Sequence, residues 1–439
     1  MRLSDLRDRR VAVWGTGREG VAAVRTIAAL EPADLVVVDD LADSPAWELS
    51  ALAPLRTDFD ALAAADVVVR SPGIAQTHPW VIELRRRGVR ITGGTALWLA
   101  DHATSTIGVT GSKGKSTTAS LTSHLLAAVG RPNVLGGNIG IAVLDLPSAD
   151  RYVVELSVYQ CADLGDSPRI VALTSLYPEH LDWSGGEEAY YRDKLNVVAH
   201  GPERVVADGA VTARLPAGLP VFVTGRPDTF HVGPEGFRRG PEPLFPREAL
   251  PLVGRHNEAN LCVALGVLEA DGVDCVASRE VLAASLRTFR ALEHRLTPIE
   301  DPSGITFVDD SIATIPEAAI HAIEAYADRP LTVIVGGHDR GLDYTPLRDF
   351  LASRGITATV IGVPDSGPRI LSVLDDVPTL STVAARDLVE AVRLARERTP
   401  AGGVVLLSPA APSYGRFDNF EHRSRVFRQA IQDTAARLR

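Results

Sequence analysis

The sequence predicts an α/β protein built from three domains in series. Its 439 residues exceed what one hydrophobic core usually organises, so two or three domains are expected. Short apolar runs rich in valine and isoleucine alternate with segments rich in alanine and leucine along most of the chain. That rhythm is typical of parallel strands joined by helices. No repeat of fixed period and no low-complexity tract interrupts it.

The first predicted domain covers residues 1–102. Strands are expected at 10–15, 34–40, 66–73 and 89–94, and a helix at 20–30. The first strand ends in GTGREG, Gly15 to Gly20, and the acidic pair Asp39-Asp40 follows about twenty residues later. This resembles the dinucleotide fingerprint of a Rossmann-like domain, although GxGxxG alone is weakly specific and another diphosphate could be the ligand. SPGI, residues 71–74, ends a later strand and could close the same pocket.

The central predicted domain, residues 103–297, and the third, residues 298–439, continue the rhythm. Central strands are expected at 105–109, 151–156, 169–176 and 203–209, followed by a helix at 257–272. The stretch 213–252 is rich in proline and glycine and predicts short antiparallel strands and turns. Third-domain strands are expected at 305–311, 331–337, 357–362 and 402–409, with a closing helix from about Asn419.

A candidate phosphate loop, TGSKGKSTT, connects the first central strand to a helix. Glycines let backbone N–H groups converge on phosphate oxygens, and the helix N-terminus adds partial positive charge. Lys115 would reach the β- and γ-phosphates and Ser116 would hold Mg²⁺. The spacing departs from the usual motif, because Gly111 lies only three positions before Gly114. A glycine-rich turn that binds nothing is therefore an alternative for this loop taken alone.

Polar side chains follow two further central strands. Glu155 ends the strand YVVE, and His180 and Asp182 come after the strand IVALTSL, with Lys194 on the next helix. Carboxyl ends of parallel strands present ligands, so Ser116, Glu155 and His180 indicate a site for one or two Mg²⁺ ions. Taken singly, Glu155 could be a solvated residue at a strand end, and His180 could have a purely structural role.

Composition excludes several classes of partner. The net charge is −10 without blocks of like charge, which argues against nucleic acid or a membrane as main partner. Cys161, Cys262 and Cys275 form no metal-binding or redox pattern and predict buried thiols in a reducing compartment. No signal-peptide core and no long apolar run occurs, so a cytoplasmic protein is expected.

Motifs along the whole chain resemble those of the Mur ligases, the ADP-forming amide ligases of peptidoglycan precursor synthesis. They are TGSKGKSTT, GGNIG (136–140), ELSVYQ, PEHLDW, GRHNEAN (254–260), LEHRL (292–296), DDS (309–311), GGHDRGLDY and SPAAPSYGRFDNFEHR. The short phosphate loop is that family's own variant. Within the family, GTGREG, SPGI and the C-terminal signature are most similar to the member that joins glutamate to UDP-N-acetylmuramoyl-L-alanine.

The resemblance implies a role for each matching position. Lys115, His180 and Lys194 would be catalytic, and Lys194 would be carbamylated so that its new carboxylate positions Mg²⁺ together with Ser116, Glu155 and His180. ATP would contact Gly111, Ser112, Lys113, Gly114, Lys115, Ser116, Thr117, Asn257, Asn260, Arg295 and Asp310. The UDP-linked substrate would contact Gly17, Arg18, Ser71, Gly73 and Asn138. The incoming amino acid would contact Thr314, Arg340, Ser413, Tyr414 and Phe420.

Departures from the family pattern fall in the third domain, where the amino acid would bind. Arg340 stands in GGHDRGLD where D-glutamate-adding members usually have lysine, Ile312 stands in DSIATIPEAA, and SYGRF is also unusual. These changes favour L-glutamate and a separate epimerase that inverts the product, with D-glutamate as the alternative. A monomer using ATP and Mg²⁺ is expected. A folylpolyglutamate-type ligase, a non-catalytic phosphate-loop regulator and a nicotinamide sensor stay open as more distant alternatives.

Overall fold

The chain forms two compact units. The fold comes from a computed structural model that describes residues 1–39, 49–179, 181–290, 296–339, 341–413 and 415–436. One unit comprises Met1–Leu250 and Glu258–Phe289, and the other Pro251–Asn257 and Arg290–Arg439. Within these described ranges, no helix combines the length and the apolar character needed to cross a membrane.

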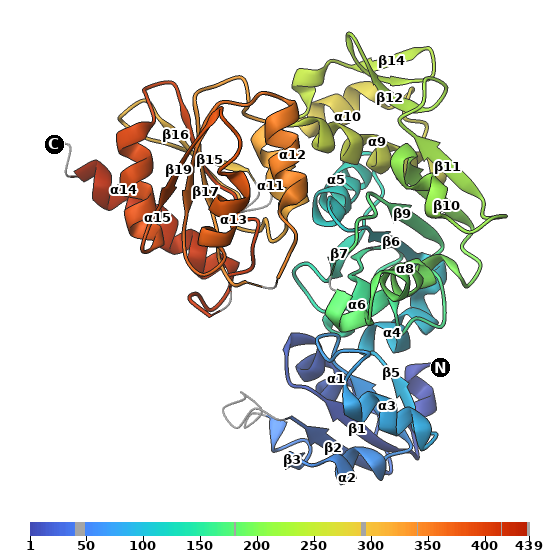
Figure 1. The fold of residues 1–439 in the computed structure, drawn as a ribbon. Helices are drawn as coiled ribbons and strands as arrows, with labels where there is room; N and C mark the ends of the chain where they lie inside the picture. The colour runs from blue at the N-terminus through green and yellow to red at the C-terminus, as the bar shows by residue number, and fades with distance from the viewer. Residues whose placement is uncertain (40–48, 180, 291–295, 340, 414, 437–439) are drawn as a thin grey trace. The chain divides into compact units, whose positions relative to one another are not determined.

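The first sheet contains five parallel strands in the order β3-β2-β1-β4-β5. They are β1 (Arg10–Trp14), β2 (Asp34–Val38), β3 (Leu55–Arg56), β4 (Val67–Arg70) and β5 (Arg90–Thr92), accompanied by helices α1 (Arg18–Ala28), α2 (Phe59–Ala63), α3 (Pro79–Arg86) and α4 (Gly94–His102) (Figure 1). The strand order reverses between β1 and β4, where ligands of open α/β sheets bind. GTGREG follows β1 and SPGI follows β4, so both loops lie at that point.

The central sheet contains six parallel strands in the order β11-β10-β9-β6-β8-β7. They are β6 (Thr106–Thr110), β7 (Val134–Gly137), β8 (Tyr152–Glu155), β9 (Ile170–Leu173), β10 (Arg204–Asp208) and β11 (Val221–Thr224). The helices are α5 (Lys115–Ala128), α6 (Val158–Cys161), α7 (Leu181–Ser184), α8 (Glu187–Leu195), α9 (Arg255–Ala270) and α10 (Arg279–Leu286). A small antiparallel sheet follows, with β12 (Phe230–Gly233), β13 (Gly236–Arg239) and β14 (Glu242–Phe245).

The third sheet has the order β15-β16-β20-β17-β18-β19, in which β15 is antiparallel to β16 and the other pairs are parallel. Its strands are β15 (Thr297–Glu300), β16 (Thr306–Asp309), β17 (Leu331–Val335), β18 (Ala358–Gly362), β19 (Leu380–Ala384) and β20 (Val404–Leu407). Its helices are α11 (Pro316–Glu324), α12 (Thr345–Ser353), α13 (Gly367–Leu374), α14 (Leu388–Arg398) and α15 (Phe420–Ala436).

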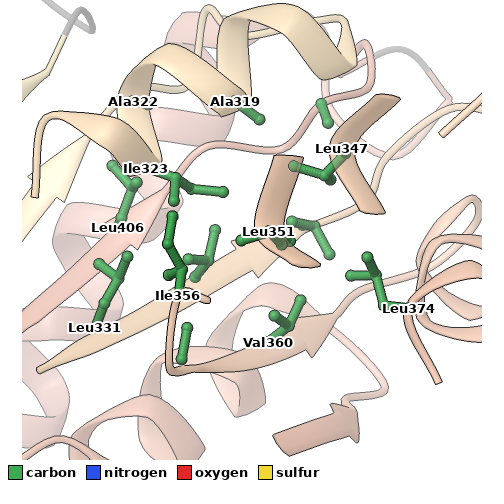
Figure 2. Packing of buried hydrophobic residues seen from close by; sticks show 14 of the residues in the cluster. Ala319, Ala322, Ile323, Leu331, Leu347, Leu351, Ile356, Val360, Leu374 and Leu406 are labelled. Carbon is green, nitrogen blue, oxygen red and sulfur yellow. The ribbon is translucent and has the colours of Figure 1, made fainter. Parts of the chain in front are cut away.

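Helices cover both faces of the third sheet, because side chains of its strands alternate between two apolar clusters. On one face, Leu331, Val360 and Leu406 pack against Ile323 of α11 and Leu351 of α12 (Figure 2). On the other face, the intervening strand residues pack against α14 and α15; the cluster includes Ile334, Ile361, Val405, Ala391, Val392, Phe427 and Ile431. This arrangement leaves the loops after the parallel strands as places where function can reside.

The predicted α/β class with parallel sheets is confirmed, but several strand predictions are wrong. Strands β3 and β7 were not predicted, and two further details differ. Val221–Thr224 was expected among antiparallel strands, but β11 pairs in parallel with β10 and extends the central sheet. The remainder of that stretch does form the antiparallel β12–β14 sheet. The third domain was expected to hold four strands, yet β15 and β19 also join its sheet. The boundaries at residues 102 and 297 remain predictions.

Candidate active site

The phosphate loop has the geometry that its glycines predict. It leaves the buried strand β6 and enters α5 at Lys115, with Gly114 as the residue that precedes the helix. Gly111 and Gly114 have φ values of +148° and +85°, which favour glycine. A Cβ on Gly111 would lie 2.1 Å from Thr174 Oγ1, and one on Gly114 would lie 2.3 Å from Asn260 Oδ1. The shorter spacing therefore still gives a tight loop against its neighbours.

Residues after β9 hold this loop in place. The Ser112 amide donates to the carbonyl of Ser175 at 2.7 Å, and the Lys113 amide donates to Ser175 Oγ at 2.8 Å. The hydroxyl of Ser112 contacts that of Tyr190 at 2.6 Å. Lys115 Nζ donates to the carbonyl of Ser112 at 2.9 Å, which keeps its ammonium group over the loop. Ser116 and Thr117, also predicted to contact ATP, lie in the first turn of α5 and are buried.

Glu155 lies beside this loop, because β8 pairs directly with β6 and places Val109 opposite Glu155. Its carboxylate is buried; Oε1 accepts from Asn138 Nδ2 at 2.7 Å, while Oε2 has no hydrogen-bond partner among the described residues. A buried carboxylate oxygen without a donor is costly unless a cation meets it. The carboxylate oxygen Oε2 of Glu155 and the hydroxyl of Ser116 in the phosphate loop are oxygen donors of the kind that fits Mg²⁺.

Lys194 is the second unusual group of the site. The residue is only 2% exposed, and its Nζ donates to the carbonyl of Gly111 at 2.8 Å. Burial, with the nearby Lys115 ammonium as a second cause, lowers the pKa of Lys194 from 10.5 to about 7. A large fraction of its amine is then neutral near pH 7, and a neutral amine is the form that reacts with CO₂.

The first domain contributes residues predicted to hold the UDP-linked substrate. Arg18 donates to the carbonyls of Gly140 at 2.8 Å and of Asn138 at 3.1 Å, so it contacts the GGNIG loop of the central domain. Ser71 Oγ donates to the carbonyl of Gly15 at 2.9 Å, which joins the two loops at the strand-order reversal. Gly17 and Gly73 are exposed on these loops.

Asp39 follows β2 at the position where a dinucleotide-binding domain would use an acid for ribose. Its Oδ2 instead accepts from the Thr16 amide at 2.7 Å and from the Thr16 hydroxyl, and the residue is 4% exposed. This carboxylate fixes the turn after β1. Asp40, the second acid of the predicted pair, lies outside the described residues.

Comparison with known proteins decides the family. The chain is 66% identical to the UDP-N-acetylmuramoyl-L-alanine–L-glutamate ligase of Salinispora tropica, over 99% of this chain and 100% of that protein. It is 39% identical to the ligase of the same name from Xanthomonas axonopodis pv. citri, over 98% of this chain and 96% of that protein. The family model for the Mur ligase middle domain matches residues 109–211. The chain belongs to the Mur ligase family.

Solved Mur ligases share its fold at low sequence identity. The UDP-N-acetylmuramate–alanine ligase of Thermotoga maritima has a TM-score of 0.59 at 18% identity, covering 97% of this chain and 100% of that one. The MurF ligase of the same organism, solved in complex with ADP, has a TM-score of 0.57 at 16% identity, covering 100% of this chain and 97% of that one. These similarities concern the fold alone.

The Mur ligase motifs of the third domain meet at the ends of three neighbouring strands, β16, β20 and β17. Asp310 is buried and accepts from Ser408 Oγ at 2.8 Å. The hydroxyl of Ser311 donates to the carbonyl of Phe420 at 2.9 Å. Ser413 is buried on the loop after β20, and Thr314 is partly buried just before α11. The DDS motif and the SPAAPSYGRFDNFEHR motif thus contact each other at the carboxyl ends of β16 and β20.

Some predicted site residues lie outside the described part of the chain, namely His180, Arg295, Arg340 and Tyr414. The two asparagines of the GRHNEAN motif belong to different units. Asn260 packs against Gly114 of the phosphate loop, whereas Asn257 Nδ2 donates to the carbonyl of Val253 at 2.8 Å.

Sequence reasoning missed one buried cation of this Mur ligase. Arg423, 1% exposed in α15, donates to the carbonyls of Ser311 at 2.6 Å and of Ala411 at 3.0 Å. It thereby joins the loops after β16 and β20. Its place in the NFEHR motif was a signal, but nothing in the sequence says that a surface-type residue is buried there.

Proposed function

We propose that the protein is an ATP-dependent, ADP-forming ligase that joins L-glutamate to UDP-N-acetylmuramoyl-L-alanine. The observation that carries the proposal is the group formed by the phosphate loop, the buried carboxylate of Glu155 and the buried amine of Lys194 at the carboxyl ends of the central strands. The relatives that share most of its length carry this activity in their names. The reaction class is amide formation driven by ATP.

The chemistry proceeds in two transfers. The terminal carboxylate of the alanine attacks the γ-phosphorus of ATP, so that a C–O–P bond forms and ADP leaves. The neutral amine of glutamate then attacks the acyl carbon; inorganic phosphate leaves from the tetrahedral intermediate and the nitrogen loses a proton. Lys115 and the N-terminus of α5 offset negative charge on the transferred phosphoryl group. Gly17, Arg18, Ser71 and Gly73 would orient the UDP-linked substrate.

Mg²⁺ would be held by Ser116 and Glu155, with His180 and carbamylated Lys194 as the further ligands that the family motifs imply. When bound, it supplies positive charge at the phosphate oxygens. Asn138 orients Glu155 by donating to Oε1, which leaves Oε2 for the metal. The Lys194 amine would add to CO₂ through its nitrogen and lose one proton, and the low pKa of Lys194 supports that step.

L-Glutamate is proposed as the incoming amino acid, and a separate epimerase would then invert the product. Eight relatives with the L-glutamate name include proteins 37% to 66% identical to this chain. Arg340, at the position of the usual lysine, would bind a carboxylate as a bidentate fork. Thr314, Ser413, Tyr414 and Phe420 would complete that pocket.

One assay tests the proposal. Purified protein receives UDP-N-acetylmuramoyl-L-alanine, ATP and Mg²⁺ with either L-glutamate or D-glutamate, and released phosphate is measured. We expect release that requires both the UDP-linked substrate and L-glutamate, with D-glutamate at least ten times less effective, about 1.4 kcal/mol of discrimination. Preference for D-glutamate would reverse the stereochemical assignment. Phosphate release that does not depend on the UDP-linked substrate would contradict the proposed ligase activity.

A further inference from the structure

The segment that follows β9 bridges two functional loops of different domains. At its upstream end, Glu179 Oε1 accepts from Lys113 Nζ of the phosphate loop at 3.0 Å. At its downstream end lies α7, Leu181–Ser184. Position 180, predicted to bind the metal, lies between these two attachments in the sequence. Glu179 and α7 are therefore each attached to another part of the unit.

The downstream attachment is a set of contacts with the SPGI loop and the residues after it. Trp183 Nε1 donates to the carbonyl of Pro72 at 3.0 Å, and the amide of Gln76 donates back to the carbonyl of Trp183 at 3.2 Å. The hydroxyl of Thr77 donates to the carbonyl of Asp182 at 3.1 Å. Three hydrogen bonds thus tie α7 to the loop predicted to contact the UDP-linked substrate.

The indole of Trp183 also contacts a buried guanidinium group, that of Arg70. Trp183 is 5% exposed, and the guanidinium of Arg70 lies 5.2 Å from the centre of its ring. The fully buried Arg70 side chain pairs with Asp163 at 2.6 Å, and Gln76 Nε2 donates to the same carboxylate at 3.1 Å. A buried, hydrogen-bonded ion pair tolerates little displacement, because moving one partner leaves the other uncompensated. Separating Arg70 from Asp163 at this junction would therefore be costly.

We propose that Trp183 is a positioning residue that couples the UDP-substrate loop to the ATP and metal site. The proposal rests on the proposed function. A ligand that orders Pro72 and its neighbours also orders α7 through the indole N–H, and thereby the chain that reaches Lys113. Binding of the UDP-linked substrate then strengthens binding of the nucleotide, and by linkage the nucleotide strengthens binding of the substrate by the same factor.

The test measures that factor directly. The dissociation constant of a non-hydrolysable ATP analogue with Mg²⁺ is determined with and without saturating UDP-N-acetylmuramoyl-L-alanine, in the full chain. We expect the substrate to tighten nucleotide binding at least fivefold in the wild type. In Trp183→Phe, which keeps an aromatic ring but removes the N–H donor, the factor falls below twofold and kcat falls about tenfold.

Two control variants distinguish a loss of coupling between the two ligands from a general loss of stability. Trp98→Phe alters another buried tryptophan, whose ring contacts are His102 and Tyr152, and it keeps the wild-type factor. Thr77→Ala removes one exposed attachment and lowers the factor partially.

A wild-type factor retained in Trp183→Phe and Thr77→Ala overturns the positioning role, and so does the absence of coupling in a wild type that turns over. Because this measurement needs no turnover, a wild type that couples the two ligands yet releases no glutamate-dependent phosphate would instead reject the proposed function.

Discussion

At the scale of single residues, Lys194 is the group whose chemistry differs most from its usual behaviour. It is buried, its pKa is lowered to about 7, and its amine lies against the phosphate loop at the carbonyl of Gly111. Between pH 7 and 10.5 the unfolded lysine is charged while the buried one is largely neutral. Carbamylation converts this cation into the anion that a metal site needs, so burial and function agree.

We predict that Lys194→Ala abolishes ligase activity and that added short carboxylates partly restore it, because they supply the missing anion. In the wild type, activity falls as the pH drops below about 7, where the protonated amine no longer reacts with CO₂, and bicarbonate reverses part of that loss. A ¹³C carbamate signal after labelling with ¹³C-bicarbonate, absent in Lys194→Arg, is the direct measurement. Full activity of Lys194→Ala without additives would contradict the prediction.

Lys115 gives a second prediction at this scale. Its ammonium lies over the phosphate loop, and removing it takes away charge that the transferred phosphoryl group requires. Lys115→Ala should abolish ADP formation while the dissociation constant of the UDP-linked substrate changes less than threefold, because Lys115 is not among the predicted substrate contacts. Calorimetric titration checks the binding. Undiminished turnover would remove Lys115 from the ATP site.

At the scale of elements, the two ends of α5 provide a matched pair of glycines. Gly114 before the helix and Gly130 after it both have positive φ, +85° and +75°. A Cβ at Gly114 would collide with Asn260, whereas a Cβ at Gly130 meets nothing within 4 Å. Both substitutions cost roughly 1 kcal/mol of backbone strain, but only one distorts the phosphate loop.

We therefore predict that Gly114→Ala weakens binding of the ATP analogue at least tenfold and that Gly130→Ala leaves it within twofold. Thermal unfolding of both variants serves as the control. Both lose stability through backbone strain, and Gly114→Ala loses more because of its collision with Asn260. Equal nucleotide binding by the two variants would show that the loop does not depend on its contact with Asn260.

The elements also show what a sequence can predict. Strands inside the sheets, such as β6, β8 and β9, are buried on both faces and read as continuous apolar runs, so their existence was predicted correctly. The strands that were missed or misassigned, β3, β7, β11, β15 and β19, lie at sheet edges. Edge strands are short and partly exposed, so their residues carry a weaker apolar pattern.

The candidate site also contains features that the sequence predicted and features that it did not. Glu155 and the phosphate loop were predictable, because each follows an apolar strand directly and the sheet brings strand ends together. The contact of Trp183 with Pro72 was not predictable, since it joins loops 111 residues apart through tertiary packing alone. Burial of Arg70 was equally hidden, because its partner Asp163 is 93 residues away.

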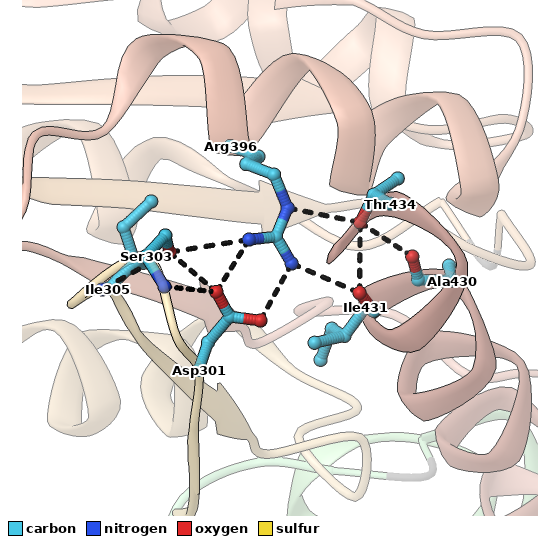
Figure 3. A network of polar contacts seen from close by, with 7 residues as sticks. All are labelled: Asp301, Ser303, Ile305, Arg396, Ala430, Ile431 and Thr434. Atoms are coloured by element: carbon cyan, nitrogen blue, oxygen red, sulfur yellow. Dashed lines mark hydrogen bonds and ion pairs between the residues drawn. The ribbon is translucent and has the colours of Figure 1, made fainter. Parts of the chain in front are cut away.

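A buried ion pair fixes the start of the third sheet to its two C-terminal helices. The guanidinium of Arg396 on α14 binds both oxygens of Asp301, at 2.6 and 2.9 Å, and donates to the Ile431 carbonyl and Thr434 hydroxyl of α15 (Figure 3). This pairing lowers the pKa of Asp301 to about 2. Relative to an ordinary value near 3.8, that shift corresponds to about 2 kcal/mol of stability.

We predict that Asp301→Asn lowers the unfolding free energy of this unit by about 2 kcal/mol at pH 7. The contribution is complete above about pH 4 and disappears as the pH falls toward 2, so wild type and variant converge there. Arg393→Ala, which breaks an exposed pair with Glu397 on the same helix, should cost less than about 0.5 kcal/mol. Denaturant unfolding at several pH values measures all three proteins, and a pH-independent difference would contradict the assignment.

At the scale of the whole molecule, the chain behaves as two units, each with its own core. The clusters around Leu331 and around Phe427 belong entirely to the second unit, while those of the first two sheets belong to the first. Units with separate cores unfold with limited cooperativity between them. A ligand confined to one unit should then stabilise only that unit.

We predict two transitions in thermal or denaturant unfolding. Without ATP, UDP-N-acetylmuramoyl-L-alanine at 100 times its dissociation constant should stabilise the first unit by about 2.7 kcal/mol and leave the second unchanged, because the residues predicted to bind it all lie in the first unit. Asp301→Asn identifies the second transition by lowering it alone. Calorimetry resolves the two steps. One transition that moves as a whole with ligand and with the variant would contradict independent unfolding of the two units.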